Sequence, residues 1–294
     1  MHYRRSKSKV IFDILNMSFL IGLSIACIFP IIHVLAMSLS SKTAVDSGFV
    51  TLFPIDFTLD SYKFVIAKKE FFAAFLVTLK RLLLGVPLNL VLAILSAYVL
   101  SKSNKEFPKR TVFAWIFMFT MLFSGGLIPT FVLIDQLDLI DKIWALVLPG
   151  AVPVYYVVLL LNFFRGIPKD FEDAAFIDGA GHFRILWSIF IPLSLPSIAT
   201  ITLFSMVDHW NAWFDGIIYM NRPEHYPIQS YLRTLFVDED VLAKVMIDAQ
   251  NLDNISNRTQ TAAQIFVATV PILLVYPLLQ RYFVTGLTLG GIKE

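Results

Sequence analysis

The sequence has little charge and almost no cysteine. Of its 294 residues, 16% are charged and one, Cys27, is a cysteine. Soluble domains carry about 25% charged residues, so this composition argues against an ordinary soluble domain. A single cysteine excludes an internal disulfide, and five scattered histidines give no metal-binding spacing. A net charge of +2 gives no indication of nucleic-acid binding, and we expect no nucleic-acid partner.

Motifs for catalysis and nucleotide binding are also missing. Four residues separate Gly286 from Gly291, but Ile292 follows where a phosphate-binding loop needs lysine. His209 is next to Asp208, and adjacent residues on a helix do not face each other. No Ser/His/Asp set or pair of carboxylates stands out. The sequence therefore predicts that this chain is not an enzyme and binds no cofactor or metal of its own.

Long uncharged apolar segments are what the sequence does contain, and 57% of its residues are hydrophobic. A helix needs about 20 apolar residues to cross a bilayer. Lipid cannot satisfy open backbone groups, so each spanning segment must be helical. Six segments have the required length: 14–41, 82–101, 111–134, 143–164, 185–207 and 259–280. We expect an all-α membrane protein with six transmembrane helices, in contact with lipid.

The basic residues predict the orientation of these spans. An even number of spans places both termini on one side of the membrane. Lysine and arginine cluster in the tail 1–13 and around Lys105, and basic segments stay in the cytoplasm. The prediction is a cytoplasmic N-terminal tail, a membrane domain over 14–284 and a cytoplasmic tail over 285–294. We expect a multi-pass membrane protein with both termini in the cytoplasm.

Two charged groups fall on the predicted external side. Lys80 and Arg81 precede the second span, and we expect them at the outer interface with their charges in water or headgroups. An alternative is that this pair attracts an anionic substrate. The external segment 208–258 is the longest and contains the acidic residues Asp238, Glu239 and Asp240. Loops of this length often have a function, and a cap over the helix ends is the other interpretation.

A polar insert interrupts the apolar pattern between the fourth and fifth spans. Pro168 suits the first turn of a helix, and acidic residues follow where the helix dipole favours them. Gly179 suits the position after a helix end. We therefore predict a cytoplasmic helix over 168–178 and a second short helix from His182 towards Pro192. One face of the first helix would carry Phe171, Ala174, Ala175 and Asp178.

The insert resembles the coupling motif of binding-protein-dependent ABC importer permeases. That motif reads E-A-A, three residues, G, nine residues, I, any residue, L-P. Here it falls on Asp173, Ala174, Ala175, Gly179, Ile189, Ile191 and Pro192. The spacing matches throughout, with Asp173 in place of Glu and Ile191 in place of Leu. Glu172, next to Asp173, is an alternative for the charged contact.

Three further elements resemble the carbohydrate branch of this family, the permeases similar to those of maltose systems. These are Trp210-Asn211 with Trp213-Phe214, the run Tyr226-Pro227-Ile228-Gln229, and the ending Gln280-Arg281-Tyr282-Phe283-Val284. The branch includes permeases for complex plant or host oligosaccharides, some of them acidic, which fits the Lys80-Arg81 pair.

The resemblance implies a type I ABC importer transmembrane domain with a cytoplasmic coupling helix, located in a bacterial cell membrane. It implies a second, different permease, two ATPase subunits that hold ATP and Mg, and an extracellular or periplasmic sugar-binding protein. The ATPase-coupling residues it implies are Glu172, Asp173, Ala174, Ala175, Asp178, Gly179, Ile189 and Pro192. The segment with Asp238, Glu239 and Asp240 would reach into the binding protein.

Aromatic and amide side chains are candidates for a carbohydrate path, because rings stack on sugar faces and amides bind hydroxyls. The candidates are Tyr155, Asn162, Trp210, Asn211 and Trp213. Packing between helices and an interfacial aromatic belt are the alternatives for each. The rival functions are an ion-gradient-driven secondary transporter and a membrane scaffold. A secondary transporter is expected to have inverted repeats and intramembrane acids, and the six segments contain no acid.

Overall fold

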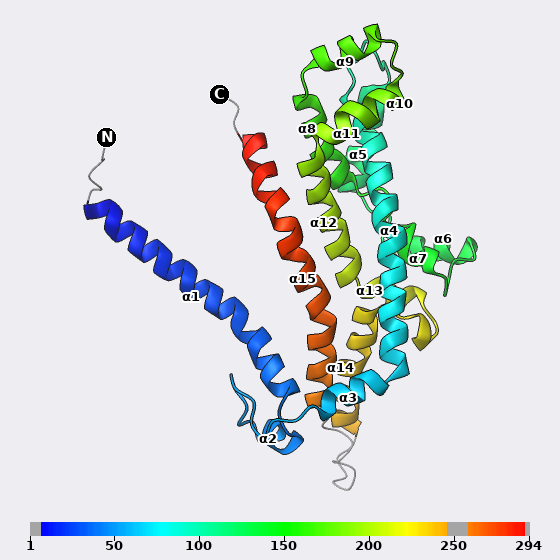
Figure 1. The fold of residues 1–294 in the computed structure, drawn as a ribbon. Coiled ribbons are helices and arrows are strands. Elements are labelled where there is room, and N and C mark those ends of the chain that lie inside the picture. Colours follow the sequence, from blue (N-terminus) through cyan, green and yellow to red (C-terminus); the bar gives the residue numbers. More distant parts are fainter. Residues whose placement is uncertain (1–6, 246–257, 292–294) are drawn as a thin grey trace. The chain divides into compact units, whose positions relative to one another are not determined.

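A computed structural model describes residues 7–245 and 258–291 (Figure 1). Within these ranges the chain forms helices and no strand. The chain divides into two compact units, one with residues 1–69 and 234–270 and the other with 70–233 and 271–294. Helices α14 (Ile228–Val245) and α15 (Arg258–Gly291) each pass from one unit into the other.

The first unit begins with the long apolar helix α1 (Lys7–Ser38), followed by α2 (Lys42–Asp46) and α3 (Asp60–Ala67). A small core forms around Ala36 and Val45, and the Ser38 hydroxyl lies 2.8 Å from the Tyr62 hydroxyl. The predicted tail 1–13 is therefore helical from Lys7 onward, and its first six residues lie outside the described ranges.

The second unit is organised around α4 (Lys69–Ser101). The buried residues of α4 recur every three or four positions and lie on one face: Phe71, Ala74, Thr78, Arg81, Gly85, Asn89, Ala93, Ala97 and Leu100. Small residues on this face allow close helix packing, as is common in membrane proteins. The main core joins α4 to α8 (Val154–Gly166) and α12 (Leu195–Asn211) through residues such as Ala93, Leu160 and Ile201.

Among the described residues, three helices are individually long and apolar enough to cross a membrane, namely Ser8–Ser38, Lys69–Ser101 and Arg258–Val275. Two bent helix pairs raise this number to as many as five if each pair is one span, and Val154–Gly166 is a shorter apolar helix. Three of the six predicted segments are therefore broken into separate helices.

The third predicted span, 111–134, consists of α5 (Arg110–Leu122) and α6 (Leu127–Gln136), which are bent by 111° relative to each other. Gly126 at the bend has a φ of 87°, a left-handed conformation that glycine adopts without a Cβ clash. The chain at Gly125-Gly126 can therefore turn where hydrophobicity alone predicted a straight helix.

The fourth predicted span, 143–164, is split into α7 (Ile143–Val147) and α8 (Val154–Gly166). Pro149, Gly150 and Pro153 lie in the gap, and proline cannot donate the hydrogen bond that a continuing helix needs. The Asn89 side-chain amide donates to the carbonyls of Gly150 (2.8 Å) and Ala151 (3.0 Å). These bonds satisfy carbonyl groups that the break leaves open.

The fifth predicted span, 185–207, is bent by 82° between residues 182–193 and α12 (Leu195–Asn211). The predicted external loop 208–258 is also largely helical where it is described, because it contains the end of α12, α13 (Phe214–Tyr219) and α14. The sixth predicted span lies within α15, which continues past residue 280 to Gly291. The predicted tail 285–294 is thus partly helical.

Candidate functional site

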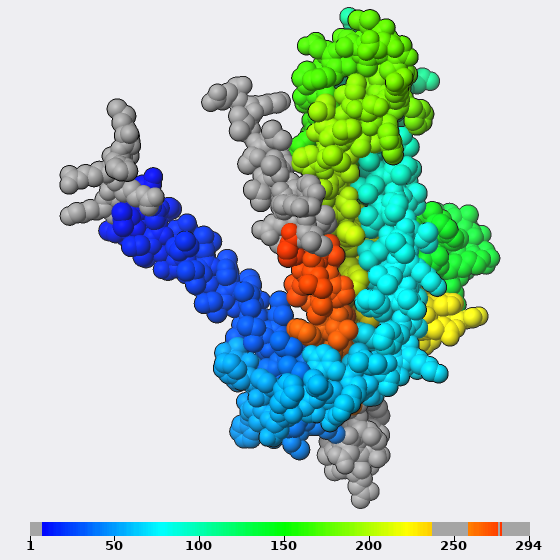
Figure 2. Space-filling view, viewed as in Figure 1, coloured from blue at the N-terminus to red at the C-terminus, as the bar shows by residue number. Residues whose placement is uncertain are grey.

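The polar insert forms a helical elbow at one end of the second unit (Figures 1 and 2). Helix α9 (Lys169–Ile177) begins after Pro168 and ends at Asp178. Gly179 follows with a φ of 78°. The N–H of Gly179 donates to Phe176 O (3.0 Å) and that of Ala180 donates to Ala175 O (2.9 Å). These two bonds form a Schellman ending, in which glycine supplies the left-handed residue.

The two sides of α9 have different surroundings. Ala175 is half-buried against the core, and Glu172 is also partly buried. Asp173 and Ala174 are exposed, and Ile177 is 87% exposed. The expected contact face is therefore divided, because Ala175 packs inside this chain while Phe171, Ala174 and Asp178 remain exposed. The exposed side is the one that another protein can reach.

A buried ion pair joins α9 to the end of α4. The Lys102 ammonium group is paired with the Glu172 carboxylate, and the Lys102 side chain is 8% exposed. The same ammonium group lies 3.9 Å from the Tyr98 ring centroid and 4.8 Å from that of Phe190. Aromatic faces stabilise a cation that has lost water. Glu172 is thus occupied within the chain, whereas the neighbouring Asp173 carboxylate is exposed.

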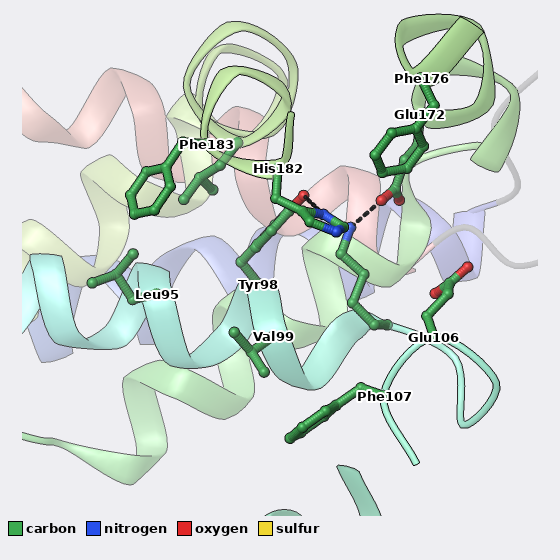
Figure 3. A pocket seen from close by; sticks show the side chains of 11 residues that line it. Leu95, Tyr98, Val99, Glu106, Phe107, Glu172, Phe176, His182 and Phe183 are labelled. Atoms are coloured by element: carbon green, nitrogen blue, oxygen red, sulfur yellow. Dashed lines mark hydrogen bonds and ion pairs between the residues drawn. The ribbon is translucent and has the colours of Figure 1, made fainter. Parts of the chain in front are cut away.

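A cavity of about 510 Å³ lies beside this ion pair, between α9, the start of the next helical segment and α4. Figure 3 shows Tyr98, Glu172 and His182 converging on one corner of it, where the Tyr98 hydroxyl lies 3.2 Å from His182 Nδ1. Glu106 also lines the cavity. A hydrogen bond from the Ser103 backbone N–H holds the pKa of the Glu106 carboxyl below its usual value. The elbow therefore has open space next to its main electrostatic contact.

The chain returns from the elbow through α10 (His182–Ile185), the π-helical turn η1 (Leu186–Phe190) and α11 (Ile191–Leu193). Phe190 is buried and Ile189 is half-buried against the core, while Pro192 is exposed. Pro192 has no N–H to donate back into the preceding turn, which favours the wider π-helical hydrogen bonding there. This segment anchors the elbow to α12 through side-chain packing.

A second buried ion pair lies towards the other end of α4. Arg81 Nη1 donates to Asp215 Oδ1 (3.1 Å), and Arg81 Nη2 donates to Asp215 Oδ2. The Arg81 side chain is 5% exposed. Our expectation that Arg81 extends to water is therefore wrong, and only Lys80 is exposed. A bidentate partner from α13 makes burial of the guanidinium possible.

This ion pair continues into a chain of hydrogen bonds. Arg81 Nε donates to His209 Nδ1 (3.2 Å), so His209 carries its proton on Nε2 and donates it to Asn89 Oδ1 (2.8 Å). Ser205 Oγ donates to the same oxygen (2.9 Å). Gly85 makes the approach possible, since a Cβ there would lie 2.5 Å from His209 Nε2. The network thus connects α4, α12 and α13 to the broken fourth segment.

The residues predicted to line a sugar path differ in their exposure. Trp210 is 3% exposed, and its ring packs edge-on against Phe75 with centroids 6.0 Å apart. In this structure Trp210 is a packing residue, and its assignment to the path stays a prediction. Trp213, Tyr155, Asn162 and Asn211 are exposed and stay candidates. Asp238, Glu239 and Asp240 lie in α14, and their side chains are outside what the structure describes.

A helical unit with long apolar helices and a polar helical elbow is typical of a class, the permease subunits of ABC importers. Residues 65–288 match the family described as "Binding-protein-dependent transport system inner membrane component". The chain belongs to this family. Its fold is therefore that of a type I importer transmembrane domain, and its role is transport rather than catalysis, as the sequence predicted.

Two relatives from Bacillus subtilis align over nearly their whole length. The chain is 37% identical to the polygalacturonan/rhamnogalacturonan transport system permease protein YtcP, over 96% of this chain and 98% of the relative. It is 34% identical to the protein LplC, over 98% of this chain and 97% of the relative. A solved bacterial ABC transporter involved in import of the acidic polysaccharide alginate matches with a TM-score of 0.85 and 33% identity, covering 96% of this chain and 99% of that one.

Proposed function

We propose that this chain is one transmembrane half of an ATP-driven oligosaccharide importer. It would work with a second, different permease, two ATPase subunits that bind ATP and Mg, and an external sugar-binding protein. Both termini would be cytoplasmic, with six membrane crossings built in part from bent helices. The carbohydrate class is supported by the relatives that are named for polysaccharide transport.

The elbow is the part through which the ATPase subunits would transmit their movement to this chain. The observation that carries this proposal is the difference in burial and pairing between two adjacent acidic residues. Glu172 is held by Lys102 within the chain, while Asp173 is exposed beside Ala174 and Ile177. We assign the charged ATPase contact to Asp173. Glu172 would instead transmit movement of α9 to the end of α4.

Transport would follow from movement of the elbow against the helices. When the ATPase subunits close, they would push α9 and its anchor, Ile189 to Pro192, towards a new position. The cavity beside Lys102 gives α9 space to move. Alternating access would follow as α12 rocks relative to α4. The segment that contains Asp238, Glu239 and Asp240 would contact the binding protein, and deletion of 238–248 would impair sugar delivery.

Co-purification tests the proposal. The chain is expressed together with candidate permease, ATPase and binding-protein partners, captured through a tag on this chain and reconstituted in liposomes. We expect ATPase subunits to co-purify and sugar-loaded binding protein to stimulate ATP hydrolysis. A stable lone subunit that imports solute with a proton or sodium gradient would instead support the secondary transporter.

A further inference from the structure

We propose that Trp213 and Arg233 form a carboxylate-binding subsite that takes a uronate residue of the transported oligosaccharide. The Arg233 guanidinium carbon lies 5.4 Å from the centroid of the Trp213 ring. Both side chains are exposed, Trp213 by 42%. The inference rests on the proposed oligosaccharide import and specifies the chemical class of the sugar.

The charge of Arg233 is available, in contrast to that of Arg81. Asp215 neutralises Arg81 in the interior. Among the side chains that the structure describes, no carboxylate lies within ion-pair distance of Arg233. A guanidinium group has five N–H donors in a planar fork that matches a carboxylate, and a ring face can hold that plane without using its donors. Arg233 therefore offers a cation that is oriented but not paired.

The polypeptide around the two residues is closely packed, which fixes their relative positions. The Ser230 hydroxyl, fully buried, donates to Trp213 O (2.7 Å) and lies one turn before Arg233 on α14. A Cβ on Gly216 would lie 2.1 Å from Ser230 Oγ, so α13 approaches α14 as closely as glycine allows. The Ile228 N–H donates to Thr78 Oγ1 (2.8 Å), which ties the start of α14 to α4. Such support preorganises a binding group.

The chemistry of a uronate sugar fits this pair. Its carboxylate can accept two parallel hydrogen bonds from the guanidinium, and its apolar C–H face can contact the indole. A neutral sugar supplies only the second contact. The relative named for polygalacturonan transport and the alginate importer both have names that specify acidic polysaccharides.

The test uses the whole importer in liposomes, with binding protein, and two probes of the same chain length: trigalacturonate and its fully methyl-esterified form, which lacks the charges. Arg233→Gln should lower import of trigalacturonate about tenfold, as expected for loss of a charge-assisted hydrogen bond, with import of the ester unchanged. Import of trigalacturonate by Arg233→Lys should lie between that of the unaltered importer and that of Arg233→Gln, because an ammonium group does not form the planar fork. Trp213→Leu should reduce import of the acid more than that of the ester.

Arg222→Gln is the matched control, because Arg222 is also exposed and its Nε lies 3.2 Å from Asp141 Oδ2, outside the subsite. Arg222→Gln should leave the ratio of trigalacturonate import to ester import unchanged. Equal losses of both probes in Arg233→Gln, or no loss of either, would overturn the subsite. Equal loss is what a contact with the binding protein or lipid would give. An unaltered importer that takes only the ester, or that takes neither probe while sugar-loaded binding protein still stimulates its ATP hydrolysis, would overturn uronate selectivity alone. Absence of that stimulation would overturn the proposed function.

Discussion

The two buried ion pairs of the second unit lie near opposite ends of α4 and are held in different ways. Arg81 and Lys102 are about 30 Å apart along the helix at 1.5 Å per residue, close to the thickness of a hydrocarbon core. Arg81 has a bidentate partner and a hydrogen-bond chain that reaches Gly150. Lys102 has one carboxylate, two aromatic rings and an adjacent cavity.

From this difference we expect the two ends of α4 to differ in how much their surroundings move during transport. A buried network held by several hydrogen bonds has one favoured arrangement, and partial loss leaves buried groups unsatisfied. A single ion pair beside a cavity can change position, because water that enters the cavity can solvate the two charges. We therefore expect the Arg81 end to stay fixed during transport and the elbow to accommodate displacement of α9.

The largest expected effect comes from Arg81→Met, which removes the cation from the fixed end. It leaves the Asp215 carboxylate without its partner, and breaking a buried pair costs about 3–5 kcal/mol. We expect a strong fall in the melting temperature of the detergent-solubilised protein. Lys80→Met is the control, since Lys80 is exposed, and it should change little. Similar melting temperatures for both variants would contradict a structural role for the Arg81 network.

Gly85→Ala should have the next largest effect. The added methyl would lie 2.5 Å from His209 Nε2 and displace the ring, which breaks the chain from Arg81 to Asn89. Overpacking of this kind costs about 1–3 kcal/mol. Gly22→Ala on α1 is the control, because no atom lies within 4 Å of a Cβ there. The comparison is made by thermal unfolding, and equal stability of the two variants would show that the contact at His209 is unimportant.

Lys102→Met tests the mobile end. We expect a loss of about 1–2 kcal/mol, less than for Arg81→Met, because the cavity admits water to the unpaired Glu172 carboxylate. The number of sugars imported per ATP hydrolysed should fall, since α9 would lose its link to α4. A double-mutant cycle with Glu172→Gln should show that the two effects are not additive. Additive effects would mean that the ion pair does not carry the coupling.

The smallest expected change in stability is at Gly179. Gly179→Val should cost about 1 kcal/mol, because a β-branched residue disfavours the left-handed conformation at the end of α9. Gly179→Asn is the control, since asparagine tolerates that conformation. A Cβ at this position meets no atom of this chain. Import assays separate two causes: loss only in the valine variant indicates backbone strain, and loss in both indicates a close contact with the ATPase.

The sequence alone predicted the helical class, the family and a helix over 168–178, where α9 has its ends within a residue. Those features depend on local signals: apolar length, a proline start and a glycine end. It missed the bend at Gly126, because hydrophobicity alone does not show where a helix turns. The prolines near residue 150 indicated a kink, but not two separate helices, because the Asn89 amide that satisfies the freed carbonyls comes from a remote part of the sequence. The sequence also misplaced Arg81, which is buried.

The two ion pairs could not be predicted from one sequence. Lys102 and Glu172 are 70 residues apart, and Arg81 and Asp215 are 134 apart. Only the fold brings these groups together. Consequently the sequence left open which of Glu172 and Asp173 faces the ATPase, and the burial of Glu172 supports Asp173.

The central claim, that α9 contacts an ATPase subunit, is tested most directly by photo-crosslinking. A benzophenone amino acid replaces Ile177, which is 87% exposed on α9, or Lys80 towards the far end of α4. Illumination of the assembled importer should join this chain to an ATPase subunit from position 177 and not from position 80. The absence of that product from position 177, in an importer that still hydrolyses ATP, would contradict the account.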